Sequence, residues 1–452
     1  MLQLLPDFSK ENKPMPKTVN QSIKPLNTTR NNLGNLEISG CDTVELARKY
    51  GTPLYVMDEV TLRQIAKEYK NAFSSYKKTN MMYASKALMT SQIAKILHEE
   101  GFGFDVVSGG EIYTIHNAKV DMNFATFNGN NKTKDEIETA LKLNIGRISV
   151  DNFLEVKMLD EEAKKQNKVQ KILLRITPGI ECHTHKYIQT GHLDSKFGFD
   201  LTQIDEVINL IKNECSNLEI KGLHAHIGSQ IFETKVYYDE IGVLIKELKR
   251  INTTHKLNLD EINAGGGLGI TYIATDCPPS VDTIANTIIT SIKDHCKKYD
   301  VEEPVLYIEP GRSIVGTAGV TLYTIGSNKQ VPNGRKYIAV DGGMADNPRP
   351  SMYEAKYYAE IANYKNNKNM EKVTVAGRFC ESGDILIKDI ELNDPRTGDI
   401  LCVYNTGAYG YSMSSNYNRV LKPAMILVNN SQSDIIIKRE TYEQLVQNDV
   451  LK

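Results

Sequence analysis

The sequence predicts an α/β protein, in which a (β/α)8 TIM barrel is followed by an all-β domain of the sandwich or barrel type. A chain of 452 residues is too long for one ordinary core and fits a barrel of roughly 250 residues with a second domain. From Thr79 onward, short apolar runs alternate with segments of helical periodicity, the pattern of repeated βα units. After about Thr317 the runs become short and β-rich, with Gly, Pro and Asn turns between them.

Eight apolar runs are expected to form the barrel strands, because each has the length and composition of a buried parallel strand. They lie at residues 81–85, 103–107, 123–127, 147–150, 172–176, 222–227, 259–263 and 305–308. Several intervening segments open with a helix-capping signal, as at Thr133 with Glu136. Polar and charged residues follow the ends of these runs, where a barrel carries its active site.

We expect four segments along the chain. Residues 1–40 are polar and rich in Asn, Lys, Thr and Pro, so they are predicted to be a loosely ordered extension. Residues 41–53 are a lead-in strand that could pack with the β domain, and residues 54–317 form the barrel. Residues 318–452 form the β domain, with strand-like runs at 321–325, 337–340, 372–376, 400–404 and 424–428.

Composition excludes several classes of function. The formal net charge is −2 and the charged residues are interspersed, so no basic stripe is available for nucleic acid. No apolar run approaches the roughly 20 residues of a membrane span. We therefore expect a small-molecule partner, neither nucleic acid nor membrane.

The cysteines indicate a reducing compartment. The seven are odd in number, scattered and free of Cys-x-x-Cys pairs, which is typical of neither a disulfide framework nor a zinc cage. No secretory signal opens the chain, and Asp7, Glu11 and the single Arg30 fit a transit peptide poorly. We expect a cytoplasmic protein, with organelle import through the N-terminal extension as the alternative.

Lys86 follows the first predicted barrel strand, in Tyr-Ala-Ser-Lys-Ala. A lysine there is commonly a solvated charge at the rim, and the functional alternative is a Schiff base with a carbonyl compound. A glycine run, Gly265-Gly266-Gly267-Leu268-Gly269, follows the seventh strand. Backbone without side chains can approach a phosphate and present N–H groups to it, although a plain tight turn is the other interpretation.

His224 and His226 stand two residues apart in a predicted strand, so they are expected on one face. A metal site is one interpretation, but no third ligand has matching local spacing. We favour an imidazole stacked on an aromatic cofactor, with Ser229 donating to its phosphate. A second cluster is interpreted as a polar lid over the site and not as a metal centre; it comprises Glu181, Cys182, His183, His185 and His192.

The eighth predicted strand ends in Glu309-Pro310-Gly311-Arg312. A buried carboxylate at the mouth of a barrel needs a partner, and a protonated pyridine nitrogen would be one. The planar fork of Arg312 suits a phosphate or a substrate carboxylate. A structural ion pair between Glu309 and Arg312 is the alternative.

Cys380 stands beside Glu381 and close to Asp384 in a predicted turn of the β domain. Neighbouring carboxylates favour the protonated thiol, which suits a proton donor better than a nucleophile. A buried, hydrophobe-like cysteine is the alternative.

Taken together, seven motifs in order resemble the diaminopimelate decarboxylase family, of the pyridoxal-phosphate barrel group that also contains ornithine decarboxylase. The motifs lie at residues 83–87, 224–230, 265–269, 309–313, 349–353, 380–384 and 407–410. The resemblance extends from about residue 51 to about residue 428. Within residues 345–350, the residues before Arg349 are less apolar than those that the family often has. This difference concerns the path of the loop, whereas Arg349 itself matches the family.

The resemblance implies decarboxylation of meso-2,6-diaminopimelate to L-lysine and CO2, the last step of lysine biosynthesis, with pyridoxal 5'-phosphate as cofactor. It implies that Lys86 holds the cofactor as an aldimine, that His226 stacks on the ring and that Glu309 bonds the ring nitrogen. Asp105 would orient Lys86 or His226. The remaining cofactor-binding residues would be Ser229, Gly265, Gly266, Gly267, Pro310, Gly311, Arg312 and Tyr409.

The same resemblance assigns the substrate residues. Arg312, Arg349 and Tyr353 match the family's carboxylate binders, Glu381 matches the group that faces the distal amine, and Tyr409 would touch the substrate. Cys380 would return a proton to the α-carbon. In the family the loop with Cys380 and Glu381 reaches the active site of the neighbouring chain, which implies a homodimer with shared sites.

Three alternatives remain at this stage. A decarboxylase for ornithine, arginine or carboxynorspermidine would not need Arg349, and ornithine decarboxylases carry Cys-Asp where this chain has Cys380 and Glu381. An amino-acid racemase would use a second acid/base, such as a tyrosine of the partner chain, in place of Cys380. A non-catalytic homologue would be expected to lose Lys86 or Cys380, and both are present.

Overall fold

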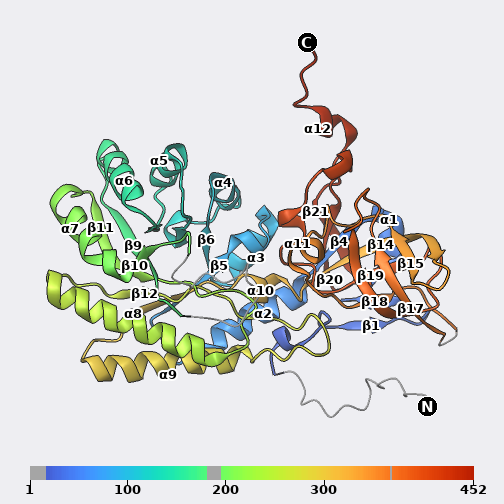
Figure 1. Ribbon diagram of the computed structural model, residues 1–452, viewed down its shortest axis with the longest axis horizontal. Helices are drawn as coiled ribbons and strands as arrows, with labels where there is room; N and C mark the ends of the chain where they lie inside the picture. The colour runs from blue at the N-terminus through green and yellow to red at the C-terminus, as the bar shows by residue number, and fades with distance from the viewer. Residues whose placement is uncertain (1–16, 181–194, 367–368) are drawn as a thin grey trace.

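The computed structural model describes residues 17–180, 195–366 and 369–452. Figure 1 shows a barrel with its helices on one side of the molecule and a β-rich domain on the other. The predicted lid residues at 181–192, and residues 1–16, lie outside the described part of the chain. No helix among the described residues is both long and apolar enough to cross a membrane.

Eight parallel strands close into the predicted barrel. They are β5 (Thr79–Ala84), β6 (Gly103–Val106), β7 (Ala125–Phe127), β8 (Arg147–Val150), β9 (Gln170–Thr177), β11 (Leu218–His224), β12 (Glu261–Asn263) and β13 (Val305–Ile308). Each pairs with its neighbour in this order, and β13 pairs back to β5, which confirms the predicted fold class. A short strand, β10 (Phe199–Asp200), adds to β9.

Helices cover the outside of the barrel. They are α2 (Glu59–Ala72), α3 (Ser91–Glu99), α4 (Gly109–Asn117), α5 (Lys134–Lys142), α6 (Phe153–Lys165), α7 (Ile204–Glu214), α8 (Thr234–His255) and α9 (Val281–Tyr299). Helix α5 illustrates how the sequence builds them, because Thr133 and Glu136 form the predicted capping box. Its buried residues Ile137, Ala140 and Leu141 recur at helical spacing and face the core.

One predicted strand boundary was wrong. The run expected at 222–227 forms β11 only as far as His224, so His226 lies in the loop that follows and not in the strand. The loop then passes through Gly228, which has a φ of +151°, a backbone conformation that favours glycine. The two histidines therefore differ in backbone setting, His224 at a strand end and His226 in the loop, although both line the same cavity.

The second large sheet combines residues from both ends of the chain. Its order is β18 (Ile385–Asn393), β17 (Met370–Ala376), β15 (Lys336–Val340), β14 (Gly319–Gln330), β4 (Leu54–Asp58), β20 (Ala424–Asn429) and β21 (Gln432–Ile437), with β19 (Ile400–Val403) on β14 and β16 (Ala359–Ile361) on β19. Strand β4 lies between β14 and β20. The barrel was expected to begin at residue 54, but this strand is part of the β sheet.

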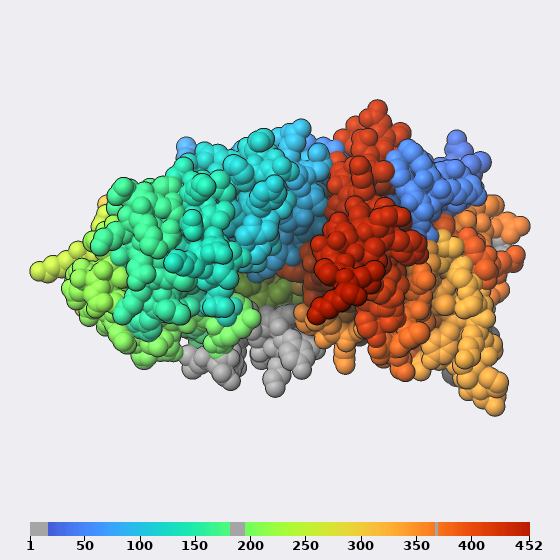
Figure 2. Space-filling view, turned by 90° about the horizontal axis from the view of Figure 1, so that it is seen from above, coloured from blue at the N-terminus to red at the C-terminus, as the bar shows by residue number. Residues whose placement is uncertain are grey.

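The expectation that residues 1–40 are loosely ordered is wrong for residues 17–40. This part contains η1 (Val19–Gln21), β1 (Thr28–Arg30) and β2 (Leu36–Ile38), and β2 pairs with β3 (Cys41–Asp42) ahead of α1 (Thr43–Tyr50). Val19, Leu36 and Ile38 are buried, so isolated apolar residues anchor a segment whose overall composition is polar. Figure 2 shows these N-terminal residues, in blue, beside the β domain.

Candidate active site

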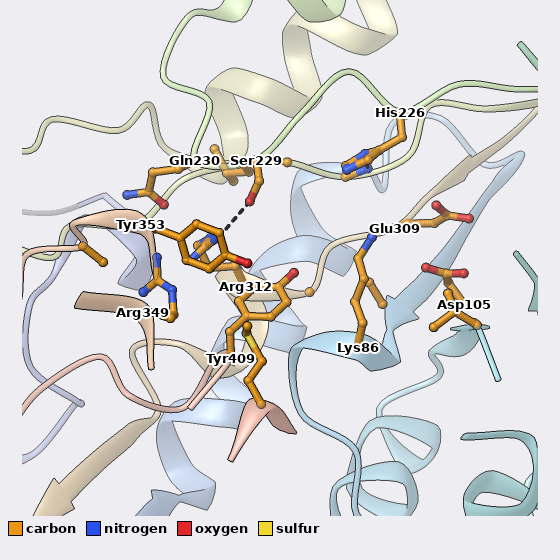
Figure 3. A pocket seen from close by; sticks show the side chains of 18 of the residues that line it. Lys86, Asp105, His226, Ser229, Gln230, Glu309, Arg312, Arg349, Tyr353 and Tyr409 are labelled. Atoms are coloured by element: carbon orange, nitrogen blue, oxygen red, sulfur yellow. Dashed lines mark hydrogen bonds between the residues drawn. The ribbon is translucent and has the colours of Figure 1, made fainter. Parts of the chain in front are cut away.

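A cavity of about 820 Å³ opens where the carboxyl ends of the barrel strands meet the β domain. Most of the predicted site residues line it: Lys86, Asp105, His226, Ser229, Gly266, Gly267, Glu309, Gly311, Arg312, Arg349, Tyr353 and Tyr409. Gly265 and Pro310 adjoin lining residues in the sequence. Figure 3 shows two groups within the cavity, Lys86, Asp105, His226 and Glu309 on one side and Arg312, Arg349, Tyr353 and Tyr409 on the other.

Lys86 lies at the end of the first barrel strand, as the sequence predicted. Strand β5 ends at Ala84 and a single 3-10 turn, η2 (Ser85–Ala87), carries the lysine. Ser85 and Ala87 are buried whereas Lys86 is exposed, so the turn directs only the lysine away from the core. Its ammonium group points toward Glu309 in Figure 3.

Glu309 is buried and ionised. Its Oε1 accepts hydrogen bonds from the Nδ2 atoms of Asn263 (2.6 Å) and Asn128 (3.2 Å), and its Oε2 lies 3.3 Å from Nε2 of His224. Burial alone would raise the pKa of Glu309, but the contact with His224 and the hydrogen bond from Asn263 lower it below its ordinary value. The site therefore holds a fixed negative charge that faces the cavity.

Asp105, near the end of β6, differs from Glu309 in the direction of its pKa shift, although both carboxyl groups accept a hydrogen bond from Asn128. Its Oδ1 accepts a hydrogen bond of 2.5 Å from the same Asn128 amide group. Burial and the negative charge of Glu309 raise the pKa of Asp105 to about 8. A cavity with one ionised and one largely protonated carboxyl group is typical of an active site.

His226 is a neutral imidazole in this arrangement. Burial and the positive charge of Lys86 hold its pKa well below the ordinary value. Its Nδ1 accepts the N–H group of Gly266 at 3.2 Å, so the ring proton lies on Nε2. The flat ring is therefore fixed in orientation beside the glycine run.

The glycine run leaves no room for side chains. A Cβ atom on Gly266 would lie 2.1 Å from the carbonyl oxygen of Glu309, and one on Gly311 would lie 2.9 Å from Cβ of Ala84. Gly265 and Gly267 have φ angles of +58° and +104°, which also favour glycine. Among the described residues, the backbone N–H groups of Gly267 and Gly311 donate to no protein acceptor. This is the kind of backbone cradle that binds an anion.

Arg312 and Arg349 lie on the other side of the cavity and are buried. Arg312 donates from Nη2 to Oγ of Ser229 and from Nη1 to Oη of Tyr272, both at 2.8 Å. Its guanidinium carbon lies 4.8 Å from the ring centre of Tyr409. The alternative of an ion pair between Glu309 and Arg312 is wrong, because the partners of Glu309 are Asn128, Asn263 and His224.

Cys380 and Glu381 do not line the cavity of their own chain. Both are exposed in a turn ahead of β18, where the N–H group of Cys380 donates to Oδ1 of Asn418 and Glu381 accepts from Tyr417. The interpretation of Cys380 as a buried, hydrophobe-like thiol is therefore wrong. Two predicted functional residues stand apart from the rest of the site.

Sequence reasoning missed several residues of the cavity. Tyr272 and Arg175 line it, and Asn263 supports Glu309 together with Asn128, which the sequence had already placed among the polar residues at the strand ends. Arg175 interrupts the apolar run of β9, and a charge inside a barrel strand is a signal that could have identified it. Tyr272 lies in an irregular loop after the glycine run, where no local pattern marks it.

Comparisons with known proteins agree with this geometry. Residues 62–316 match the family described as pyridoxal-dependent decarboxylase, pyridoxal binding domain. A diaminopimelate decarboxylase of Synechocystis is 46% identical over 97% of this chain and 95% of its own length, and one of Bacillus subtilis is 45% identical over 93% and 96%.

A solved structure extends the likeness to three dimensions. The diaminopimelate decarboxylase of M. jannaschii, whose structure was determined with L-lysine, superimposes with a TM-score of 0.88 at 34% identity and covers 96% of this chain and 99% of its own. The relatives and the solved structure agree along nearly the whole chain, and the family match covers the barrel. The chain therefore belongs to the diaminopimelate decarboxylases, within the family of pyridoxal-dependent decarboxylases.

Proposed function

We propose that this protein decarboxylates meso-2,6-diaminopimelate to L-lysine and CO2, using pyridoxal 5'-phosphate. One observation supports this most directly: Lys86 and the pair of arginines line the same cavity. A lysine amine suits a carbonyl cofactor, and guanidinium groups suit a substrate that carries a second carboxylate.

The residues present fit the cofactor. The free N–H groups of Gly267 and Gly311, with Ser229 and Arg312 close by, match a phosphate group. Lys86 would attach to the aldehyde, the flat ring of neutral His226 would pack against the pyridine, and Glu309 would hold a proton at the ring nitrogen. The remaining contacts would come from Gly265, Gly266, Pro310 and Tyr409. When bound, the cofactor supplies a sink for the electrons that remain when CO2 departs.

The protein contributes fixed charges to this step. Because its surroundings lower the pKa of Glu309 below the ordinary value, this carboxylate favours a protonated partner. Asp105 would orient Lys86 or His226. Arg312, Arg349 and Tyr353 would hold the carboxylate at the far end of the substrate, with Tyr409 in contact with it.

We further propose a homodimer whose active sites are shared. Cys380 and Glu381 are exposed outside the cavity of their own chain, which supports their action in a partner's cavity. There Cys380 would donate a proton to the α-carbon, and Glu381 would face the distal amine. A cytoplasmic location is supported by free thiols at the described cysteines Cys41, Cys215, Cys277, Cys296, Cys380 and Cys402.

The first experiment compares substrates. Purified protein with pyridoxal phosphate is given meso-diaminopimelate, L-ornithine, L-arginine or L-lysine, and CO2 release is measured. We expect turnover of diaminopimelate alone, and a loss of about three orders of magnitude or more in Lys86→Ala. Lys95→Ala, which changes an exposed lysine on α3, is the matched control. Cofactor binding without turnover of diaminopimelate would refute the substrate assignment.

A further inference from the structure

Two buried arginines of the cavity share one tyrosine. Arg312 begins α10 (Arg312–Val315) and Arg349 begins α11 (Arg349–Tyr353), so the two come from different domains. Tyr272 accepts a hydrogen bond of 2.8 Å from Nη1 of Arg312, and its ring centre lies 4.8 Å from the guanidinium carbon of Arg349. One aromatic side chain therefore contacts both cations, one through its hydroxyl group and one through its ring.

This contact is electrostatically favourable. A cation is attracted to the electrons of an aromatic ring, more strongly when both are removed from water, and Tyr272 is only 5% exposed. Burial alone would raise the pKa of Tyr272, but the charges of Arg312 and Arg349 lower it below the ordinary value. The hydroxyl oxygen of Tyr272 thus lies against one cation and the ring face against the other.

A second tyrosine completes the arrangement around Arg349. Tyr357 accepts a hydrogen bond of 2.6 Å from Nη1 of Arg349, and its ring meets that of Tyr272 edge to face at 5.3 Å between centres. Tyr357 is 3% exposed. Arg349 is thus fixed from two directions, and Tyr272 contacts both Arg349 and Arg312.

The loop that carries Tyr272 is itself fixed from outside the barrel. The N–H group of Thr271 donates to the carbonyl oxygen of Asn20 at 2.9 Å. Its carbonyl oxygen accepts from Nδ2 of Asn405, at 3.0 Å. Asn20 also donates from Nδ2 to the carbonyl oxygen of Gly269. The N-terminal segment and the β domain therefore both hold the backbone immediately before this tyrosine.

We infer that Tyr272 is a positioning residue that fixes Arg312 and Arg349 in the geometry that recognises the distal carboxylate of the substrate. This inference rests on the proposed function, since it assigns the arginines to a substrate with a second carboxylate. Tyr272 itself forms no bond in the reaction. Its removal should weaken the binding of ligands that carry the distal carboxylate and leave other ligands unaffected.

The test compares two ligands that differ only in that carboxylate, L-lysine and 1,5-diaminopentane. Their dissociation constants are measured by calorimetry with the cofactor-loaded enzyme. We expect Tyr272→Phe to weaken L-lysine binding by about 10-fold and to raise the KM for diaminopimelate to a similar extent, with kcat within about 3-fold. Binding of 1,5-diaminopentane should be unchanged. Tyr358→Phe is the control, because that ring stacks on Tyr404 in the β domain.

Two further variants separate positioning from a general loss of structure. Tyr357→Phe, which loosens Arg349 alone, should give a smaller loss with the same preference between the two ligands. In an Arg349→Ala background, Tyr272→Phe should weaken L-lysine binding by less than the same change does in the wild type, because the two act together. Equal losses for both ligands, or a fall in kcat at constant KM, would overturn the inference. Absence of diaminopimelate turnover in the wild type would refute the proposed function but not this binding result.

Discussion

At the scale of single residues, Glu240 on α8 stands out because the proposed chemistry does not use it. Its side chain is completely buried, and neither carboxyl oxygen has a hydrogen-bond partner among the described residues. Burial and the negative charge of Glu309 raise its pKa well above the ordinary value. The folded protein therefore carries a protonated carboxyl group where an unfolded chain would carry a charge.

This predicts a pH-dependent stability. A carboxyl group whose pKa is raised in the folded state favours folding at acid pH, and that contribution is lost as the pH rises above the unfolded value near 4.5. Glu240→Gln should therefore match the wild type near pH 5 and exceed it increasingly toward pH 8, by about 1–3 kcal/mol in the free energy of unfolding. Urea unfolding across this range measures it. Glu206→Gln, an exposed change on α7, is the control, and a difference independent of pH would contradict the prediction.

Which residues the sequence identifies depends on where they lie. Lys86 and Glu309 follow strand ends of a repeating unit, so their place at the rim could be predicted from order alone. Tyr272 could not be predicted, because its role arises from Arg349, which the β domain brings to it. Cys380 was a candidate proton donor because of its acidic neighbours, but only the resemblance connected it with an active site, since its own chain keeps it outside the cavity.

At the scale of elements, the glycine loop after β12 combines an unusual backbone with very close packing. Gly266 contacts the backbone of Glu309 so closely that a methyl group would force the two apart. Gly266→Ala should therefore lower the free energy of unfolding by about 1–3 kcal/mol. It should also weaken cofactor binding, because the N–H groups of the cradle would move.

Thermal unfolding and a titration with pyridoxal phosphate measure the two effects. Gly326→Ala is the matched control, since its Cβ atom would have its nearest neighbour at 3.6 Å, an ordinary contact. We expect that variant to keep both stability and cofactor affinity. If Gly266→Ala lost stability yet bound the cofactor normally, the loop would be a structural turn and not a phosphate site.

The elements themselves were predicted with uneven success. The eight barrel strands were identified because buried parallel strands alternate regularly with amphipathic helices. Strand β4 was assigned to the wrong domain, because its five buried residues suit either sheet and its partners lie far along the sequence. Residues 17–40 were misjudged since a few buried side chains, such as Leu36, order a mainly polar segment.

At the scale of the whole molecule, residues of both domains line the cavity. In the proposed dimer, the partner chain would contribute Cys380 and Glu381 to it. Mixing Lys86→Ala with Cys380→Ala tests this. Each variant alone should be nearly inactive, but exchange of subunits would pair an intact Lys86 with an intact Cys380 in one of the two sites of each mixed dimer. We expect about a quarter of the wild-type activity after random exchange.

The control replaces the Cys380→Ala chain with the double variant Lys86→Ala/Cys380→Ala, which can form no intact site. CO2 release before and after exchange measures the recovery, and sedimentation gives the oligomeric state. If the mixture stayed inactive although mixed dimers had formed, Cys380 would act in its own chain or not at all.

The position of β4 between β14 and β20 also determines the order in which the protein can assemble during translation. The strand leaves the ribosome early, before the barrel, yet both of its edges remain open until Gly319–Gln330 and then Ala424–Asn429 have been made. Through most of synthesis its backbone donors and acceptors are available to the wrong partners. A chain released before residue 424 would lack β20 and would leave one edge of β4 unpaired. Translation must therefore be complete before both edges of β4 are paired within the chain.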